Sequence, residues 1–326
     1  MMKGTVLAAA CAVGLVAGTA LAAEKWDMPM AYADGNFHTQ NGKAFAECVK
    51  IGSRGELEIV VHGGGSLFKG NEIKRAVQTG QVPIGERLLS AHQNENPVFG
   101  YDSIPFLATS YEDSEKLWKA ARPVIEKVLE EQGLVLLYSV PWPPQGLYTK
   151  KAIESADDMK GVKFRAYNAA TARLAELMGA QPVQIEAAEL AQALATGVAE
   201  SFISSGATGY DRKVWDYGIE YFYNVQAWLP RNYVFVNKQA WDGLSEEARA
   251  GLRACAYMAE LSGTKWSQVY ASWTLEQLAA NGITVAPPGD RLRADFERIG
   301  EIMTEEWLEA AGEPGRQIIE AYKAMK

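Results

Sequence analysis

Short apolar runs alternate with longer segments of helical periodicity between residues 157 and 210, and glycines follow the helical segments at 179 and 197. Glycine is typical just beyond the last turn of a helix. The predicted elements are a strand at 162–164, a helix at 169–178, a strand at 182–185, a helix at 187–195 and a strand at 201–204. This β-α-β-α-β unit predicts a mostly parallel sheet with helices on both faces.

The same alternation of strands and helices extends over the rest of the chain. The other predicted strands are 25–32, 57–61, 81–85, 134–138, 233–236 and 282–286, and the other predicted helices are 39–51, 71–80, 114–132, 245–280 and 290–325. The helix at 245–280 is longer than one small lobe requires. We therefore expect it to run along two lobes.

A proline-rich passage at 140–146 (VPWPPQG) precedes the β-α-β-α-β unit. Proline favours an extended and defined backbone, which suits a crossing between two lobes. We expect an α/β fold in two lobes, each a mainly parallel sheet flanked by helices. The predicted division gives 23–145 plus about 228–262 to lobe I, and 146–227 plus about 263–326 to lobe II.

The first 22 residues have the pattern of a cleavable signal peptide. Lys3 provides a positive charge, 6–17 form an apolar core, and Ala20-Leu21-Ala22 is a small-residue cleavage signal. Later apolar runs fall short of the roughly 20 residues that a membrane span needs. We therefore expect export to the periplasm or beyond.

The chain is acidic, with a formal net charge of −8 over 326 residues. Nucleic-acid binding calls for a basic face, so the charge argues against that class of partner. A local arginine inside a cleft still permits an anionic ligand, because net charge mostly sets solubility. Cys48 and Cys255 remain after the signal segment, and the sequence is compatible with either a disulfide or two buried thiols.

Polar residues follow the predicted strands of the central unit at their carboxyl ends, where ligands bind in parallel α/β sheets. Arg165 and Asn168 follow the first of these strands, and Ser204 and Ser205 end the third. A planar guanidinium beside an amide and two hydroxyls is a good receptor for a carboxylate. We expect a pocket for a small organic acid.

Further candidates come from the first lobe and from the lobe junction. Glu86, at the predicted end of the strand at 81–85, could accept a hydrogen bond from a hydroxyl or ammonium group of the ligand. Trp142, Tyr210 and Trp228 could enclose the ligand or pack in the core between the lobes.

The chain lacks the sequence signs of the common catalytic centres. Its three histidines, His38, His62 and His92, follow no metal-ligand spacing, and the cysteines have no metal-ligand partner at a recognised spacing. The run His62-Gly63-Gly64-Gly65 has no accompanying G-x-S-x-G motif. We therefore predict a binding protein without a cofactor and without metal-ligating residues, rather than an enzyme; the sequence leaves open whether a metal ion accompanies the ligand.

Several separated motifs, in order, resemble the solute receptors of tripartite ATP-independent periplasmic (TRAP) transporters of the DctP type. They are GELEI at 55–59, LFKG at 67–70, AVQTGQV at 76–82, IPFL at 104–107, GVKFRAYN at 161–168, GAQP at 179–182, AEL at 188–190, LATGV at 194–198 and VNK at 236–238. The resemblance extends over nearly the whole chain after residue 22.

This resemblance implies a periplasmic binding protein fold that closes on its ligand and delivers it to a pair of membrane permease subunits, with an ion gradient driving uptake. It also implies that Arg165 holds the substrate carboxylate and that Asn168 and Ser204 line the pocket. Glu86 and the loop around Tyr32 would contribute from the first lobe.

One departure concerns Gln145, near which some relatives carry a second arginine; its absence argues against a second anionic group on the ligand. The aromatic residues would suit an apolar or aromatic ligand body, and a small hydroxy or keto acid fits equally well. Two other functions are compatible with the sequence, a secreted α/β enzyme acting on an organic acid and a chemosensory binding protein.

Overall fold

The computed structural model describes residues 23–326, and the signal-peptide prediction for 1–22 lies outside the described residues. The first lobe begins with β1 (Glu24–Pro29), which pairs in parallel with β2 (Leu57–His62). Helix α1 (Phe37–Gly52) connects them and begins where the side chain of Asn36 accepts a hydrogen bond from the amide of His38. The predicted strand at 25–32, helix at 39–51 and strand at 57–61 are thus present, and they form a parallel crossover.

A three-stranded sheet forms the centre of the first lobe, in the order β3 (Ile84–Leu88), β10 (Arg231–Asn237) and β4 (Leu134–Pro141). Strand β10 runs antiparallel to both neighbours because it brings the chain back from the second lobe. The helical segments of this lobe are α2 (Gly70–Gln78), η1 (Leu89–His92), η2 (Pro97–Ser103), α3 (Tyr111–Glu131) and α7 (Lys238–Gly243).

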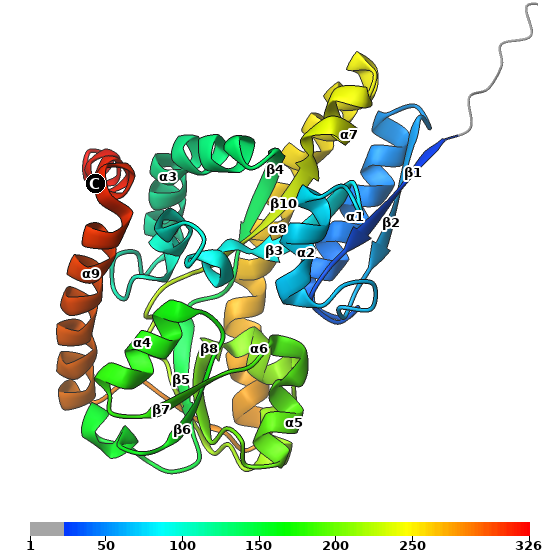
Figure 1. Ribbon diagram of the computed structural model, residues 1–326. Coiled ribbons are helices and arrows are strands. Elements are labelled where there is room, and N and C mark those ends of the chain that lie inside the picture. The colour runs from blue at the N-terminus through cyan, green and yellow to red at the C-terminus, as the bar shows by residue number, and fades with distance from the viewer. Residues whose placement is uncertain (1–22) are drawn as a thin grey trace, which may run out of the picture.

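The second lobe contains a six-stranded sheet in the order β11-β9-β5-β8-β6-β7 (Figure 1). Strands β6 (Lys163–Ala166), β7 (Gln181–Gln184) and β8 (Ser201–Ser205) are parallel, which confirms the predicted β-α-β-α-β unit. The remaining elements are β5 (Gln145–Thr149), η3 (Ala156–Met159), α4 (Ala169–Leu177), η4 (Ala187–Glu189), α5 (Leu190–Ala195), α6 (Gly206–Asp211), η5 (Val214–Tyr217), β9 (Tyr221–Tyr223) and β11 (Thr284–Ala286).

Helix α8 (Glu246–Ala280) runs along both lobes, as its length led us to expect. It begins after Ser245, whose hydroxyl accepts a hydrogen bond from the amide of Ala248. It packs against α1 in the first lobe and against α6 and β11 in the second (Figure 1). The chain also crosses between the lobes in two extended segments, 142–144 between β4 and β5 and 224–230 between β9 and β10. Helix α8 therefore forms a continuous connection beside these crossing segments.

Helix α9 (Asp290–Lys323) also contacts both lobes. It starts beside α4 and η3, bends at Gly312, and ends against α3. Trp307 and Ile318 lie in the same hydrophobic cluster as Trp118 of the first lobe. The end of this helix therefore packs on α3 of the first lobe. The predicted division of the chain between the two lobes stays a prediction.

Cys48 of α1 and Cys255 of α8 form a disulfide, with 5.7 Å between their Cα atoms. This result decides between the two states that the sequence left open. Two residues separated by 207 positions in the chain are thereby held together. The bond joins the N-terminal part of the first lobe to the helix that continues into the second.

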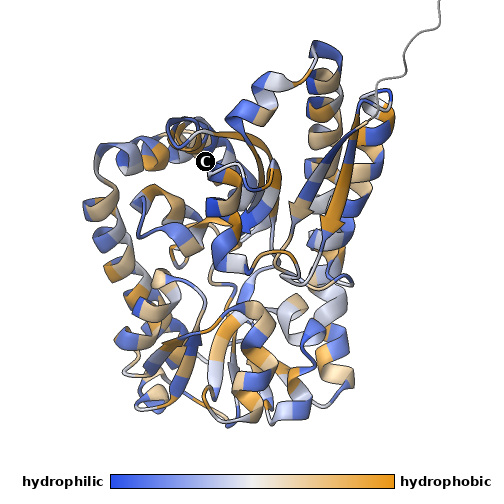
Figure 2. Ribbon diagram, turned by 45° about the vertical axis from the view of Figure 1, so that its right-hand side comes forward, coloured by the Kyte–Doolittle hydropathy of each residue, from blue (hydrophilic) through white to orange (hydrophobic). Residues whose placement is uncertain are grey.

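Hydrophobic residues gather on the strands of both lobes, while the outer helices alternate hydrophobic and hydrophilic positions (Figure 2). This distribution is the amphipathic pattern of helices that cover a sheet. Within residues 23–326, none of the helices combines the length and the apolar character of a membrane-spanning segment.

The close approach of α1 and α8 leads to a testable prediction. A Cβ atom added at Gly251 would lie 2.5 Å from the carbonyl oxygen of Gly52, and this backbone atom has little freedom to move. We expect Gly251→Ala to lower the free energy of unfolding by about 2 kcal/mol, the scale of an overpacked interior contact. Urea unfolding measures the change, and Gly243→Ala is the control because its Cβ meets nothing within 4 Å. Equal stability of the two variants would contradict the prediction.

Candidate functional site: a carboxylate pocket between the lobes

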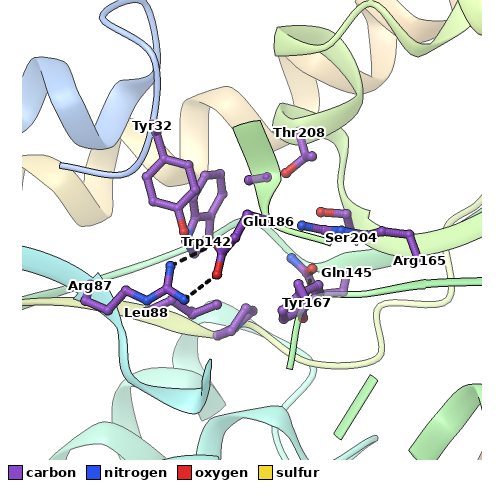
Figure 3. Close-up of a pocket in the computed structure, with 12 residues that line it drawn as sticks. Tyr32, Arg87, Leu88, Trp142, Gln145, Arg165, Tyr167, Glu186, Ser204 and Thr208 are labelled. Atoms are coloured by element: carbon purple, nitrogen blue, oxygen red, sulfur yellow. Dashed lines mark hydrogen bonds and ion pairs between the residues drawn. The ribbon is translucent and has the colours of Figure 1, made fainter. Parts of the chain in front are cut away.

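A small cavity of about 40 Å³ lies between the two lobes, with lining residues from both. Its lining comes from the loop after β1, from β3, from the crossing segments and from the strand ends of the second lobe (Figure 3). The lining residues are Tyr32, Arg87, Leu88, Trp142, Gln145, Arg165, Tyr167, Glu186, Ala187, Ser204, Thr208 and Pro230. The volume corresponds to a few water molecules, so the lobes are close together in this structure.

Arg165 stands near the carboxyl end of β6, where it is paired in register with Val183 of β7 and Phe202 of β8. The side chain is 2% exposed and extends into the pocket (Figure 3). Its Nε donates a hydrogen bond to the carbonyl oxygen of Ile185 at 2.9 Å, which fixes the direction of the guanidinium. The parallel strand ends thus place a held cation at the edge of the sheet, as predicted.

No carboxylate of the described residues forms an ion pair with Arg165. Glu186, an acid that lines the same cavity, is paired with Arg87 instead. Burial lowers the pKa of Arg165 to about 10, because desolvation disfavours the charged form and the neighbouring groups compensate only in part. An arginine in this state gains from any anion that enters the cavity.

Tyr167 and Gln145 are held by a chain of hydrogen bonds beneath the cavity. Trp228 Nε1 donates to the hydroxyl of Tyr167 at 3.0 Å, and that hydroxyl donates to Gln145 Oε1 at 3.3 Å. The Gln145 amide nitrogen donates to the carbonyl oxygen of Pro143 at 2.9 Å. Tyr167 also presents its ring to the Arg165 guanidinium at 5.2 Å. These contacts make this wall of the pocket rigid before any ligand arrives.

Two aromatic side chains form the opposite wall. The rings of Tyr32 and Trp142 meet edge to face, with 4.8 Å between centroids. Trp142 Nε1 donates to Asn232 Oδ1 at 2.8 Å, which fixes the indole. This wall offers apolar surface to the body of a ligand whose carboxylate faces Arg165.

Arg87 of β3 enters the pocket from the side opposite Arg165 (Figure 3). Its two terminal nitrogens donate to the two carboxylate oxygens of Glu186 at 3.2 and 3.0 Å. Because Glu186 follows β7, this bidentate pair joins the first lobe to the second. Neither Arg87 nor Glu186 was predicted from the sequence as a binding residue.

Five of the predicted binding residues line the cavity: Tyr32, Trp142, Gln145, Arg165 and Ser204. The other five lie outside the lining and have other contacts. Their binding roles remain predictions, and the structure gives each of them a different local role.

Asn168 and Ser205 begin helices. Asn168 is fully buried, accepts a hydrogen bond from the amide of Thr171 at the start of α4, and donates to Ser90 of the first lobe at 3.0 Å. Ser205 accepts a hydrogen bond from the amide of Thr208 at the start of α6. Both positions satisfy backbone donors at helix N-termini, which is why polar residues occur there.

Trp228 lies behind Tyr167, and Tyr210 packs on Trp273 with 4.7 Å between ring centroids. Glu86 is 3% exposed and lies 3.3 Å from Nδ1 of His38. Strand β3 extends to residue 88 instead of ending at 85, so Glu86 lies inside it and the lining residue from this strand is Arg87.

The arrangement can hold an anion. Among residues 23–326, no group of three or more potential metal ligands comes together. A fixed, unpaired arginine, aromatic walls and the hydroxyls of Ser204 and Thr208 surround a cavity between two lobes. This combination defines a ligand-binding protein for a small organic anion.

The chain belongs to the bacterial extracellular solute-binding proteins of family 7 (DctP), whose family model matches residues 30–310. Among curated relatives, a solute-binding protein of Albidiferax ferrireducens is 27% identical over 178 residues. That match covers 54% of this chain and 52% of the relative, so the chain spans about half of the relative's length.

Solved structures resemble the chain more closely. A TRAP solute-binding protein from a marine metagenome, described as specific for pyroglutamate and bound to co-purified pyroglutamate, is 53% identical, with a TM-score of 0.92 over 94% of this chain and 100% of that one. DctP6 of Bordetella pertussis, an extracytoplasmic solute receptor binding pyroglutamic acid, is 48% identical, with a TM-score of 0.91 over 92% of this chain and 100% of that one.

Proposed function

We propose that this protein is a periplasmic receptor that binds a small monocarboxylate of the pyroglutamate type between its lobes and delivers it to a TRAP-type membrane permease. The observation that carries the proposal is the buried guanidinium of Arg165, which faces the cavity and has no carboxylate partner in the described part of the chain. The ligands of the two similar receptors support the choice of a compact cyclic acid.

The mechanism follows from where the lining residues stand. Arg165 and Ser204 on the second lobe bind the carboxylate first, because they occupy the strand ends of a preformed sheet edge. Rotation about the crossing segments then brings Tyr32 and Trp142 of the first lobe over the ligand body. Closure removes water from the ion pair and thereby strengthens it.

Pyroglutamate is expected to raise the melting temperature of the purified protein by about 4 °C at one hundred times its dissociation constant, since that excess stabilises the native state by about 2.7 kcal/mol. Differential scanning fluorimetry measures the shift. The matched control is 2-pyrrolidinone, which has the same ring without the carboxylate, and it should produce no shift.

Three results would contradict the proposal. An equal shift with 2-pyrrolidinone would mean that the carboxylate is not recognised. Conversion of pyroglutamate to a product, followed by mass spectrometry, would favour the enzyme alternative. If cells that contain the permease subunits took up pyroglutamate equally well after deletion of the receptor, the proposed transport role would be wrong.

A further inference from the structure

Charge in the cavity is unevenly balanced. Three of the lining residues carry a formal charge: Arg87, Arg165 and Glu186. Two cations and one anion leave the pocket with a single positive charge in excess. The location of this excess charge depends on which of the two arginines Glu186 is paired with.

Glu186 compensates Arg87 and leaves Arg165 uncompensated. Both oxygens of the Glu186 carboxylate accept hydrogen bonds from Arg87, at 3.2 and 3.0 Å. The side chain of Arg87 is 4% exposed and that of Glu186 is 29% exposed, so the pair is only partly screened by water. The backbone at Gly70 closes over it, since a Cβ added there would lie 2.6 Å from Arg87 Nη1 and 2.9 Å from Glu186 Oε2.

Arg87 nevertheless retains a hydrogen-bond donor that the pair with Glu186 does not use. Its Nε is buried and has no hydrogen-bond partner among the described residues. A planar guanidinium has five N–H donors. The pair with Glu186 uses one edge of the group, through Nη1 and Nη2. If the acid were absent, Arg87 would offer a second carboxylate site in the same cavity, opposite Arg165 (Figure 3).

We propose that Glu186 sets the charge selectivity of the receptor by occupying Arg87, so that the closed pocket accepts ligands with one carboxylate and rejects those with two. The inference rests on the proposed function and names the class of ligand that the same site selects. Glu186 acts through Arg87 and also repels the second anion directly.

The physical reason is the cost of a second negative charge in a closed cavity. A dicarboxylate that binds Arg165 with one group would bring its second group toward Glu186, whose carboxylate already occupies Arg87. An uncompensated charge at a desolvated site weakens binding strongly. A ligand with one carboxylate meets one free guanidinium and leaves no charge unpaired. Selectivity therefore comes from a repulsive element as well as from an attractive one.

The test compares pyroglutamate with glutarate, a five-carbon acid with two carboxylates, by isothermal titration calorimetry. Four proteins form a series of pocket charge: Glu186→Gln, the parent, the double variant Arg87→Gln with Glu186→Gln, and Arg87→Gln alone. Glu186→Gln removes the negative charge with little change of shape. It is expected to improve the affinity for glutarate relative to pyroglutamate by about tenfold or more.

The double variant separates charge from loss of the interlobe contact. It lacks the pair, as Glu186→Gln does, but it again has one cation, so it should prefer pyroglutamate as the parent does. The pocket of Arg87→Gln alone has no excess charge, so the affinity for glutarate should fall more than the affinity for pyroglutamate. The order of relative glutarate affinity is thus expected to follow the pocket charge, and three folded members of the series suffice to define it.

Two outcomes overturn the inference. Equal weakening of both ligands in Glu186→Gln would show that the pair only holds the lobes together. Relaxed selectivity that persists in the double variant would show that the charge of Arg87 is not responsible. These outcomes can be distinguished from a failure of the proposed function. If the proposed function were wrong, the parent protein itself would bind neither acid, and the inference would be wrong as well.

Discussion

Replacing Arg165 by methionine is expected to weaken pyroglutamate binding by roughly two to three orders of magnitude. The substitution keeps an apolar stem of similar length and removes the cation of the pocket that has no carboxylate partner among residues 23–326. Truncating one partner of a buried charge pair costs about 3–5 kcal/mol, and each 1.4 kcal/mol is about tenfold in affinity. Isothermal titration calorimetry measures the loss directly.

The matched control is Arg173→Met on α4. Arg173 is an exposed arginine of the same lobe that pairs with Glu306 and Glu176 and does not line the cavity. This variant should bind pyroglutamate as the parent does. If Arg165→Met bound as tightly as Arg173→Met, the assignment of the carboxylate to Arg165 would be wrong.

Stability separates a binding role of Arg165 from a structural one. The side-chain hydrogen bond to Ile185 would be lost in Arg165→Met, but a buried charge without an ion-pair partner among the described residues would be removed as well. We therefore expect the unliganded variant to melt at about the temperature of the parent. A large drop in the melting temperature would instead indicate that the arginine holds the sheet edge together.

The part of the second lobe from β6 to β8 could be predicted from the sequence because its signals are local, whereas β5 and β9 of the same sheet were not predicted. Glycines beyond each helix and short apolar strands define the β-α-β-α-β unit, and parallel strand order then places Arg165 and Ser204 at one edge. The long helix from Ser245 was recognisable for the same reason, since its N-cap and its length appear in the sequence itself.

The first-lobe side of the pocket was harder because it depends on strand register. Placing β3 three residues too early made Glu86 a strand end, although it lies inside the strand. Side chains alternate between faces, so one residue of displacement exchanges what faces the cavity. Two adjacent charges within an apolar strand, Glu86 and Arg87, were the available signal that each face meets a specific partner.

Tertiary contacts explain the remaining differences. Glu186 follows a predicted strand and looks like any surface acid until the other lobe brings Arg87 beside it. Asn168 was chosen as a ligand group because it stands beside Arg165, yet its amide is used to begin α4 and to contact Ser90. Local sequence shows that such residues are polar, but only the fold decides whether they meet a ligand or a backbone.

Replacing both Cys48 and Cys255 by alanine is expected to lower the free energy of unfolding by about 3–5 kcal/mol. The bond closes a loop across a sequence separation of 207 residues, and restricting so long a segment removes much entropy from the unfolded chain. For a chain of this size the melting temperature should fall by about 6 °C. Neither cysteine lines the cavity, so pyroglutamate affinity of the folded variant should be unchanged.

The effect of the bond must be distinguished from the effect of losing two side chains, of which Cys255 is buried in the core. Reduced parent protein supplies that comparison, because it keeps both side chains and lacks only the bond. Calorimetry with a thiol reductant should lower the melting temperature of the parent nearly to that of the double variant, and the variant itself should not respond. If oxidised parent, reduced parent and variant all melted together, the chain between α1 and α8 would already be confined when unfolded, and the bond would contribute nothing to stability.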